Sequence, residues 1–140
     1  MGQRFITKAR TVTEADVVNF ACLSWDHNQL HTDADYAANT RYGRRIAHGL
    51  LGTVMHSGLA YQLTEDSIVA FLEMTWKFKL PIYVGDTIHV EQVVKEMRES
   101  AKPDRGILTF EKDIINQRGE VVQTGTTTIL LAKGSRNTHL

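Results

Sequence analysis

The chain has 140 residues, 42% of them hydrophobic and 23% charged, which is typical of one globular domain. Sixteen Lys and Arg residues balance sixteen Asp and Glu residues, so no broad positive field is present to hold nucleic acid or an anionic membrane. A single cysteine, Cys22, excludes an internal disulfide and a Cys-rich zinc site and agrees with a reducing cytoplasm. The N-terminus lacks an apolar signal-peptide core, and no stretch approaches the roughly 20 apolar residues of a membrane span. We therefore expect one cytoplasmic domain over residues 1–140, with a frayed polar tail over 133–140.

The first third of the chain predicts one short strand followed by helices. Residues 5–10 form the strand, and a helix follows over 13–24, with Asp16 completing a capping box at its start. Residues 25–45 are polar and irregular, with at most one short helix over 33–39. Loops of this length inside compact domains are often functional.

Residues 46–63 give the clearest helical pattern, with an apolar stripe at helical spacing. The stripe consists of Ile46, Leu50, Val54, Met55, Leu59 and Leu63. Gly49, Gly52 and Gly58 lie in the same segment, although each glycine costs about 1 kcal/mol relative to alanine in a helix. Three glycines therefore suggest that another part of the chain packs closely against this helix.

The second half of the chain predicts long antiparallel strands. Alternating or β-rich runs cover residues 72–80, 87–97, 108–114 and 121–132, with a hairpin turn over 116–119. Segregated helices and strands are typical of an α+β fold. We expect one long helix packed against one curved antiparallel sheet.

The polar segment after residue 24 carries the residues best suited to acid–base chemistry. It places Asp26, Asn28 and His31 within six positions. Five positions correspond to about 140° around a helix, so Asp26 and His31 would meet more easily from a bent loop. On spacing alone, the same pattern is typical of a polar turn with a solvated histidine, and this interpretation stays open.

The other histidines are assigned structural or surface positions. His48 is expected to cap or flank the long helix, and His27 and His56 to be structural or exposed. Asp, Asn and His side chains also suggest a metal, but their spacing matches no familiar zinc pattern, so no metal site is predicted.

Residues 20–51 resemble the MaoC-like dehydratase family, which includes the R-specific enoyl-CoA hydratases. The family's motif runs Gly-Asp-x-Asn-Pro-aliphatic-His, and a second signature, Ile-Ala-His-Gly, follows it. Here Asp26, Asn28, Leu30 and His31 stand in the first frame, and 46–49 is Ile-Ala-His-Gly. The resemblance implies a hot-dog fold, in which a long helix is wrapped by an antiparallel sheet, and a homodimer or higher homo-oligomer.

The resemblance also implies residue roles and a reaction. Asp26 and His31 would share one catalytic water in the reversible syn hydration of a trans-2-enoyl thioester to a (3R)-3-hydroxyacyl thioester. Asn28 would orient the site, the Gly49 N–H would polarise the thioester carbonyl, and Ser57 stands at the family's supporting hydroxyl. No cofactor is implied, since the substrate is carried on coenzyme A or an acyl carrier protein.

Two residues depart from the family motif. Trp25 stands where the family usually has glycine, and Gln29 stands where it usually has proline. A bulky Trp25 is expected to narrow or reshape the pocket, and loss of the proline to loosen the loop. Neither change removes a group that transfers protons, so the hydratase interpretation holds.

Both carriers present phosphate, for which the chain offers a local cluster of cations. Arg41, Arg44 and Arg45 precede the long helix and are candidate phosphate contacts. A solvated basic loop is an equally good interpretation of the same three residues.

Two other functions fit the same fold. A hot-dog thioesterase would release free thiol from an acyl-CoA. A non-catalytic acyl-thioester-binding subunit of a larger assembly would bind acyl-CoA tightly without turnover. The combination of Asp26, His31 and the His48–Gly49 pair favours hydration.

Overall fold

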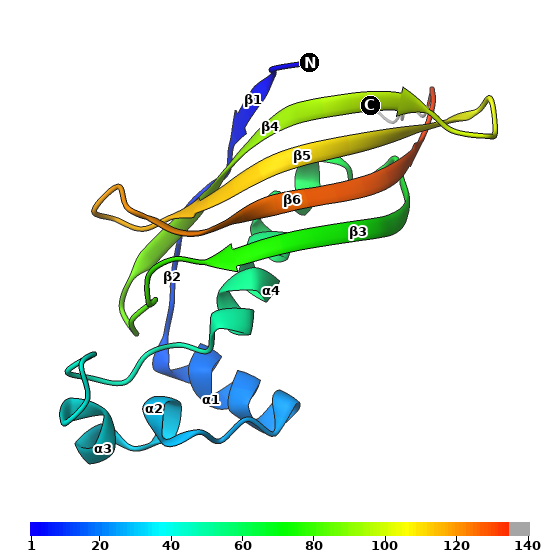
Figure 1. The fold of residues 1–140 in the computed structure, drawn as a ribbon. Helices are drawn as coiled ribbons and strands as arrows, with labels where there is room; N and C mark the ends of the chain where they lie inside the picture. The colour runs from blue at the N-terminus through cyan, green and yellow to red at the C-terminus, as the bar shows by residue number, and fades with distance from the viewer. Residues whose placement is uncertain (135–140) are drawn as a thin grey trace, which may run out of the picture.

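Four long antiparallel strands and one helix laid across them dominate the computed structural model, which describes residues 1–134 (Figure 1). The elements in chain order are β1 (Arg4–Ile6), β2 (Arg10–Thr11), α1 (Glu14–Ser24), α2 (Gln29–Thr32), α3 (Ala34–Ala38), α4 (Gly49–Ala60), the 3₁₀ turn η1 (Tyr61–Leu63), β3 (Ile68–Phe78), β4 (Thr87–Glu99), β5 (Arg105–Ile115) and β6 (Val121–Ala132). The sheet runs β1-β4-β5-β6-β3, and β2 also pairs with β4. The predicted α+β arrangement is confirmed. The tail was predicted to fray over 133–140. Within it the Lys133 N–H donates to Asp104 O at 2.7 Å, and residues 135–140 lie outside the described residues.

The three helices α1, α2 and α3 gather beyond one end of the sheet, and α4 runs from this group along the sheet face (Figure 1). The predicted capping box of α1 is present, because the Thr13 side chain accepts from Asp16 N and the Asp16 side chain accepts from Thr13 N. No helix within residues 1–134 is long and apolar enough to cross a membrane.

The prediction of one continuous strand over residues 5–10 is wrong. This segment forms two short pieces, β1 and β2, which both pair with β4. Between β1 and β2 the regular ladder of backbone hydrogen bonds is interrupted at Thr7. The Thr7 side chain, in place of a backbone carbonyl, accepts a hydrogen bond from the Val90 N–H at 2.9 Å. The predicted hairpin turn is confirmed between β5 and β6, where Asn116 Oδ1 accepts from the N–H groups of Arg118 and Glu120.

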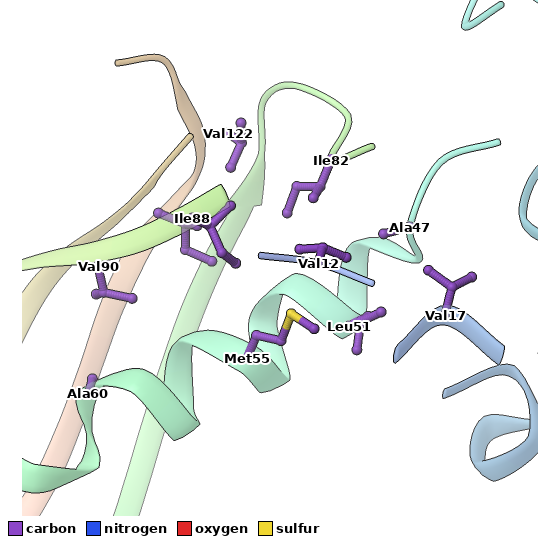
Figure 2. Close-up of a cluster of buried hydrophobic side chains, with 11 residues drawn as sticks. Val12, Val17, Ala47, Leu51, Met55, Ala60, Ile82, Ile88, Val90 and Val122 are labelled. Carbon is purple, nitrogen blue, oxygen red and sulfur yellow. The ribbon is translucent and has the colours of Figure 1, made fainter. Parts of the chain in front are cut away.

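The long helix is shorter than predicted, and only part of the predicted apolar stripe, including Met55 and Leu59, faces the core. It begins at Gly49 because Ile46 pairs with Tyr83 as an isolated β-bridge, and the Ala47 N–H donates to Ile82 O at 2.7 Å. The core buries Leu51, Met55 and Ala60 together with Ile82, Ile88, Val90 and Val122 from the sheet side (Figure 2). Leu50 and Val54, which the sequence pattern assigned to the stripe, are 62% and 57% exposed. Apolar residues lie on two neighbouring faces of α4, and the sheet covers only one of them.

Two of the three helix glycines have the close neighbours that the sequence suggested. A Cβ at Gly49 would lie 3.0 Å from the Phe78 ring, and a Cβ at Gly52 would lie 2.5 Å from Gln123 Nε2 and 2.6 Å from Ile82 Cδ1. Gly58 has no atom within 4 Å of the corresponding position, so the expectation is wrong there.

Gln123, a buried residue of β6, ties the first turn of α4 to the sheet. Its Nε2 donates to Gly49 O at 2.8 Å, and its Oε1 accepts from Thr53 Oγ1 at 3.0 Å and from Trp76 Nε1 at 2.8 Å. Position 52 must therefore be glycine, because the Gln123 side chain that lies against it also holds the start of α4 in place through its hydrogen bonds.

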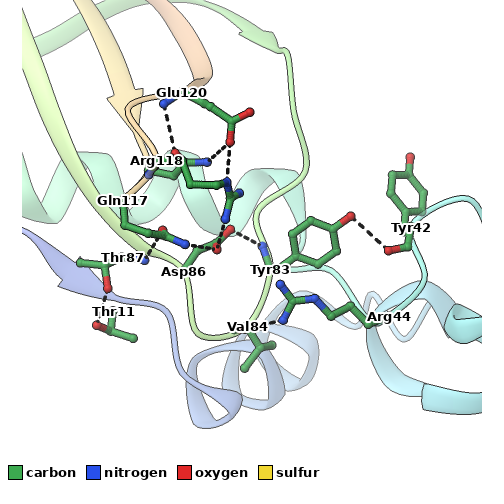
Figure 3. A network of polar contacts seen from close by, with 11 residues as sticks. Thr11, Tyr42, Arg44, Tyr83, Val84, Asp86, Thr87, Gln117, Arg118 and Glu120 are labelled. Atoms are coloured by element: carbon green, nitrogen blue, oxygen red, sulfur yellow. Dashed lines mark hydrogen bonds and ion pairs between the residues drawn. The ribbon is translucent and has the colours of Figure 1, made fainter.

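A buried carboxylate fixes the turn between β3 and β4 (Figure 3). Asp86 accepts from the Tyr83 N–H at 2.9 Å and from Gln117 Nε2 at 2.8 Å, and Arg118 lies 3.5 Å away. The Tyr83 hydroxyl in turn donates to Tyr42 O at 3.1 Å. The network thus anchors the polar loop before α4 to the sheet.

Candidate active site

A cleft of about 530 Å³ opens where the helices beyond the sheet meet the start of α4. It is lined by Phe20, Ser24, Asp26, His31, His48, Gly49, Leu50 and Phe78. A carboxylate oxygen of Asp26 and one ring nitrogen each of His31 and His48 all lie within 4.8 Å of one another. The structure therefore brings the two predicted acid–base residues into one cleft.

His31 lies on α2, a single helical turn that was absent from the sequence prediction. Its ring is buried, and Nδ1–H donates to Ile46 O at 2.8 Å. This bond leaves Nε2 of the neutral ring as the nitrogen that can accept a proton. The ring is therefore oriented by the backbone just before α4.

Asn28 organises the turn between the two acid–base residues. Its side-chain oxygen caps α2 by accepting from the Leu30 N–H at 2.9 Å, and its own N–H donates to Asp26 Oδ1 at 3.2 Å. Asn28 does not line the cleft. Any orienting role of this residue acts through the loop geometry rather than through contact with a ligand.

His48 is the N-cap residue of α4, as predicted, but its contacts with Asp26 and His31 were not foreseen from the sequence. Its ring is 2% exposed and stacks on His31 with 3.8 Å between centroids, and Nε2–H donates to Asp26 O at 2.8 Å. Burial lowers the pKa of His48 below its usual value, although the bond to Asp26 O opposes this effect. A neutral His48 thus supports both predicted acid–base residues. Its place in the Ile-Ala-His-Gly signature is the sequence feature that could have indicated this role.

The same three side chains are the donors that could hold a metal ion. The rings of His31 and His48 are stacked at 28° to each other. A metal ion must lie in the plane of each ligating ring, roughly 2 Å from its nitrogen. Rings stacked in this way have no common point within that reach, so this donor set fits a metal poorly. The absence of a metal site stays a prediction.

Gly49 opens α4 at the floor of the cleft. Its N–H belongs to the first turn, where backbone N–H groups have no partner inside the helix and the helix dipole is positive. Phe78 packs on this glycine and separates the cleft from a second one of about 540 Å³, which Gly49 and Phe78 also line.

Comparison with known proteins identifies the family. The family profile described as "MaoC like domain" matches residues 1–113. The chain belongs to the MaoC-like dehydratase family. It is 38% identical over 117 residues to an (R)-specific enoyl-CoA hydratase of Aeromonas caviae, which covers 84% of each protein. It is 31% identical over 123 residues to an (R)-specific enoyl-CoA hydratase of Rhodospirillum rubrum, covering 88% of this chain and 82% of that protein.

A solved structure supports the same assignment. The crystal structure of the MaoC-like dehydratase from Rhodospirillum rubrum superposes with a TM-score of 0.85 at 29% identity, over 94% of this chain and 92% of that chain. The hot-dog fold implied by the sequence motifs is therefore confirmed.

The three arginines before α4 occupy different environments in this MaoC-like chain. Arg41 lines the second cleft together with Lys79, which was not singled out from the sequence. Arg45 is bound by both carboxylate oxygens of Glu14 at 2.8 Å. Arg44 lies 4.2 Å over the Tyr83 ring (Figure 3). The structure thus brings Arg41 to a cleft and engages Arg44 and Arg45 elsewhere.

Ser57 does not reach the cleft of Asp26 and His31 within the protomer. It lies two turns further along α4, at a third pocket. The supporting role that the MaoC-like resemblance implied for this hydroxyl stays a prediction.

The two departures from the MaoC-like motif concern the backbone conformation at Trp25 and Gln29. Trp25 follows α1 in the left-handed conformation with φ of 64°, where glycine is favoured. Its side chain is 86% exposed and does not line the cleft, so the expected narrowing by Trp25 is wrong. Gln29 is the first residue of α2, a position that tolerates proline well and does not require it.

Trp25→Gly should therefore stabilise the protein by about 0.5–1 kcal/mol, since relief of the left-handed strain exceeds the added freedom of the unfolded chain. Urea denaturation measures the change. Leu23→Gly is the matched control, because Leu23 is as exposed but lies within α1 and should lose about 0.5–1 kcal/mol. Equal losses in both variants would contradict the assignment of strain to Trp25.

Proposed function

We propose that this chain is a hydro-lyase that reversibly hydrates trans-2-enoyl-CoA to (3R)-3-hydroxyacyl-CoA without a bound cofactor. The observation that carries the proposal is the shared cleft of the Asp26 carboxylate and the His31 imidazole beside the start of α4. The names of the two relatives, both (R)-specific enoyl-CoA hydratases, support the substrate class and the stereochemistry.

In the hydration direction, one water molecule is held between Asp26 and His31. One of the two groups accepts a proton from the water as its oxygen bonds to Cβ of the enoyl group. The other group, which enters the step protonated, delivers its proton to Cα from the same side, so the addition is syn. Transfer of the proton taken from water to this second group then restores both groups, and the net change is one water added across the double bond. Each such proton transfer typically contributes 10²- to 10⁴-fold in rate.

Negative charge develops on the thioester oxygen during this addition. The Gly49 N–H is positioned to donate to that oxygen, because it belongs to the free first turn of α4 and has no side chain to block approach. One well-placed donor of this kind contributes about 3 kcal/mol to transition-state stabilisation.

Coenzyme A is the carrier that the second cleft suits. Arg41 and Lys79 line this cleft, which adjoins the acid–base cleft across Phe78 and Gly49. Two cations beside a shared opening can bind the phosphates of a carrier whose acyl group extends toward Asp26.

The test is the hydration of crotonyl-CoA by the purified protein. We expect saturable loss of the enoyl-thioester absorbance and (3R)-3-hydroxybutyryl-CoA as product. Release of free thiol without hydration would replace the proposal by a thioesterase. Tight binding of crotonyl-CoA without turnover would replace it by a non-catalytic binding subunit, and turnover only of acyl-carrier-protein thioesters would change the carrier.

We also propose that the protein works as a homodimer formed through β3. This strand lies at the edge of the sheet, is 11 residues long and exposes Ile68, Val69, Phe71, Leu72 and Phe78. Long apolar edge strands are templates for pairing with another chain. Antiparallel pairing of two copies about Thr75 would set Glu73 opposite Lys77 of the second copy, so the charges favour self-association.

Val54→Lys should shift the protein from dimer to monomer in analytical ultracentrifugation. Val54 is exposed on the outward face of α4, which we place in the same interface as β3. Val18→Lys on α1, also exposed, is the matched control and should leave the dimer intact. A monomeric wild-type protein, or equal effects of both substitutions, would contradict this interface. The cytoplasmic location stays a prediction.

A further inference from the structure

A third pocket, of about 240 Å³, lies between the C-terminal half of α4 and the sheet. It shares no lining residue with the cleft of Asp26 and His31 or with the cleft of Arg41 and Lys79. Its volume corresponds to about eight water molecules at roughly 30 Å³ each, which is enough for a small organic molecule.

The pocket contains a lysine that has little exposed surface and no counter-ion among the described residues. Lys112 of β5 is 9% exposed, and its Nζ lies 5.5 Å from the Phe110 ring centroid. Its side chain makes no hydrogen bond or ion pair with any residue in the range 1–134. Burial lowers the pKa of Lys112 to about 8, so the group is still mostly protonated at pH 7. A buried charge of this kind is costly unless an anion pairs with it.

A second hydrogen-bond donor stands directly beside Lys112. Gln92 of β4 is its cross-strand partner and lines the same pocket, with only 3% of its surface exposed. Opposed residues of neighbouring strands have Cβ atoms about 4.5–5.5 Å apart. The amide of Gln92 and the ammonium of Lys112 can therefore reach two oxygens of one small group.

His56 faces the pocket from the α4 side as an acceptor. Its Nδ1–H donates to Thr53 O at 2.5 Å, which leaves a buried Nε2 with no partner among the described residues. Burial lowers the pKa of His56 to about 4, so the ring is neutral at pH 7. An unprotonated Nε2 repels carboxylate oxygens and directs them toward Lys112 and Gln92.

We propose that this pocket binds a carboxylate group through Lys112 and Gln92. The carboxylate is either that of a free small acid or the far end of an acyl chain whose thioester lies in the catalytic cleft. The second source rests on the proposed hydratase function, whereas the first does not. Glu65 also lines the pocket, but it is exposed and forms no ion pair with Lys112 among the described residues.

The first arm of the test measures binding of free butyrate and of its neutral analogue butyramide by calorimetry at pH 7. We expect the wild-type protein to bind butyrate at least about tenfold more tightly, by about 1.4 kcal/mol. Lys112→Met should remove this preference, and it should fold well because it removes an unpaired buried charge. Lys95→Met is the matched control, since Lys95 is exposed and paired with Glu111, and it should keep the preference.

The second arm compares a medium-chain trans-2-enoyl-CoA that ends in a carboxylate with its methyl ester. A lower KM for the acid, lost in Lys112→Met, would assign the pocket to the acyl chain. Binding of free butyrate would assign it to a separate small acid. Lack of carboxylate preference in both arms would overturn the proposal, and so would butyrate binding that appears only in Glu65→Gln, because Glu65 would then be the anion. Crotonyl-CoA turnover by the wild-type protein tests the hydratase proposal separately.

Discussion

Asp26→Asn and His31→Gln should each lower kcat for crotonyl-CoA hydration by about 10²- to 10⁴-fold. Asparagine keeps an oxygen that can accept the Asn28 N–H, as Asp26 does, but it can neither take nor give the proton. Glutamine likewise cannot exchange protons at the position of the His31 ring. Initial rates at saturating substrate measure both losses.

Because both groups act on one water molecule, their losses should not multiply. The double variant should be little slower than the slower single variant. Asp35→Asn and His27→Gln alter exposed residues outside the cleft and should retain activity. Circular dichroism checks that all variants are folded. Wild-type rates in both single variants, with the fold intact, would remove the assigned roles.

Gly52→Ala should destabilise the protein by about 2–3 kcal/mol. The added methyl would meet Gln123 Nε2 at 2.5 Å and Ile82 Cδ1 at 2.6 Å. Gln123 holds Gly49 O at the cleft floor, so any shift that accommodates the methyl also moves the start of α4. We therefore expect a loss of hydratase activity as well, and urea denaturation measures the stability term.

Gly58→Ala in the same helix is the matched control. No atom lies within 4 Å of the position its methyl would take, and alanine is the better helix former. This variant should be more stable than the wild type by about 0.5–1 kcal/mol. Destabilisation of the same size in both variants would contradict the close approach of Gln123 to Gly52.

The sequence predicted the sheet better than it predicted the long helix. The alternation of polar and apolar residues along a strand indicates which side chains face the core, so β4, β5 and β6 were located to within a few residues. In α4, apolar residues occupy two adjacent faces, and the pattern alone does not say which face the sheet covers. The buried face carries Leu51 and Met55, whereas Leu50 and Val54 are left for another surface.

The acid–base pair was predicted from its motif, but the contacts that hold the two side chains in place were not. Asp26 and His31 follow from residue type and resemblance, whereas the stacking of His48 on His31 depends on a contact between residues 17 positions apart. The left-handed backbone of Trp25 could not be foreseen, because a tryptophan gives no local signal for that conformation. Lys112 alternates in phase with Leu108, Phe110 and Ile114, but no site was assigned to it because a lysine is usually on the solvent side.

The two predicted acid–base residues lie on the short helix α2 and the loop before it, beyond the sheet, and this has a consequence for how activity is lost on heating. α2 and the loop of Asp26 connect to the rest of the protein through a few bonds, chiefly His31 to Ile46 O, His48 to Asp26 O and Arg45 to His31 O. Such a segment opens at a lower free energy than a sheet whose ladders must separate together. Inactivation should therefore precede loss of the β-sheet, and a bound substrate that bridges Asp26 and Gly49 should bring the two events together.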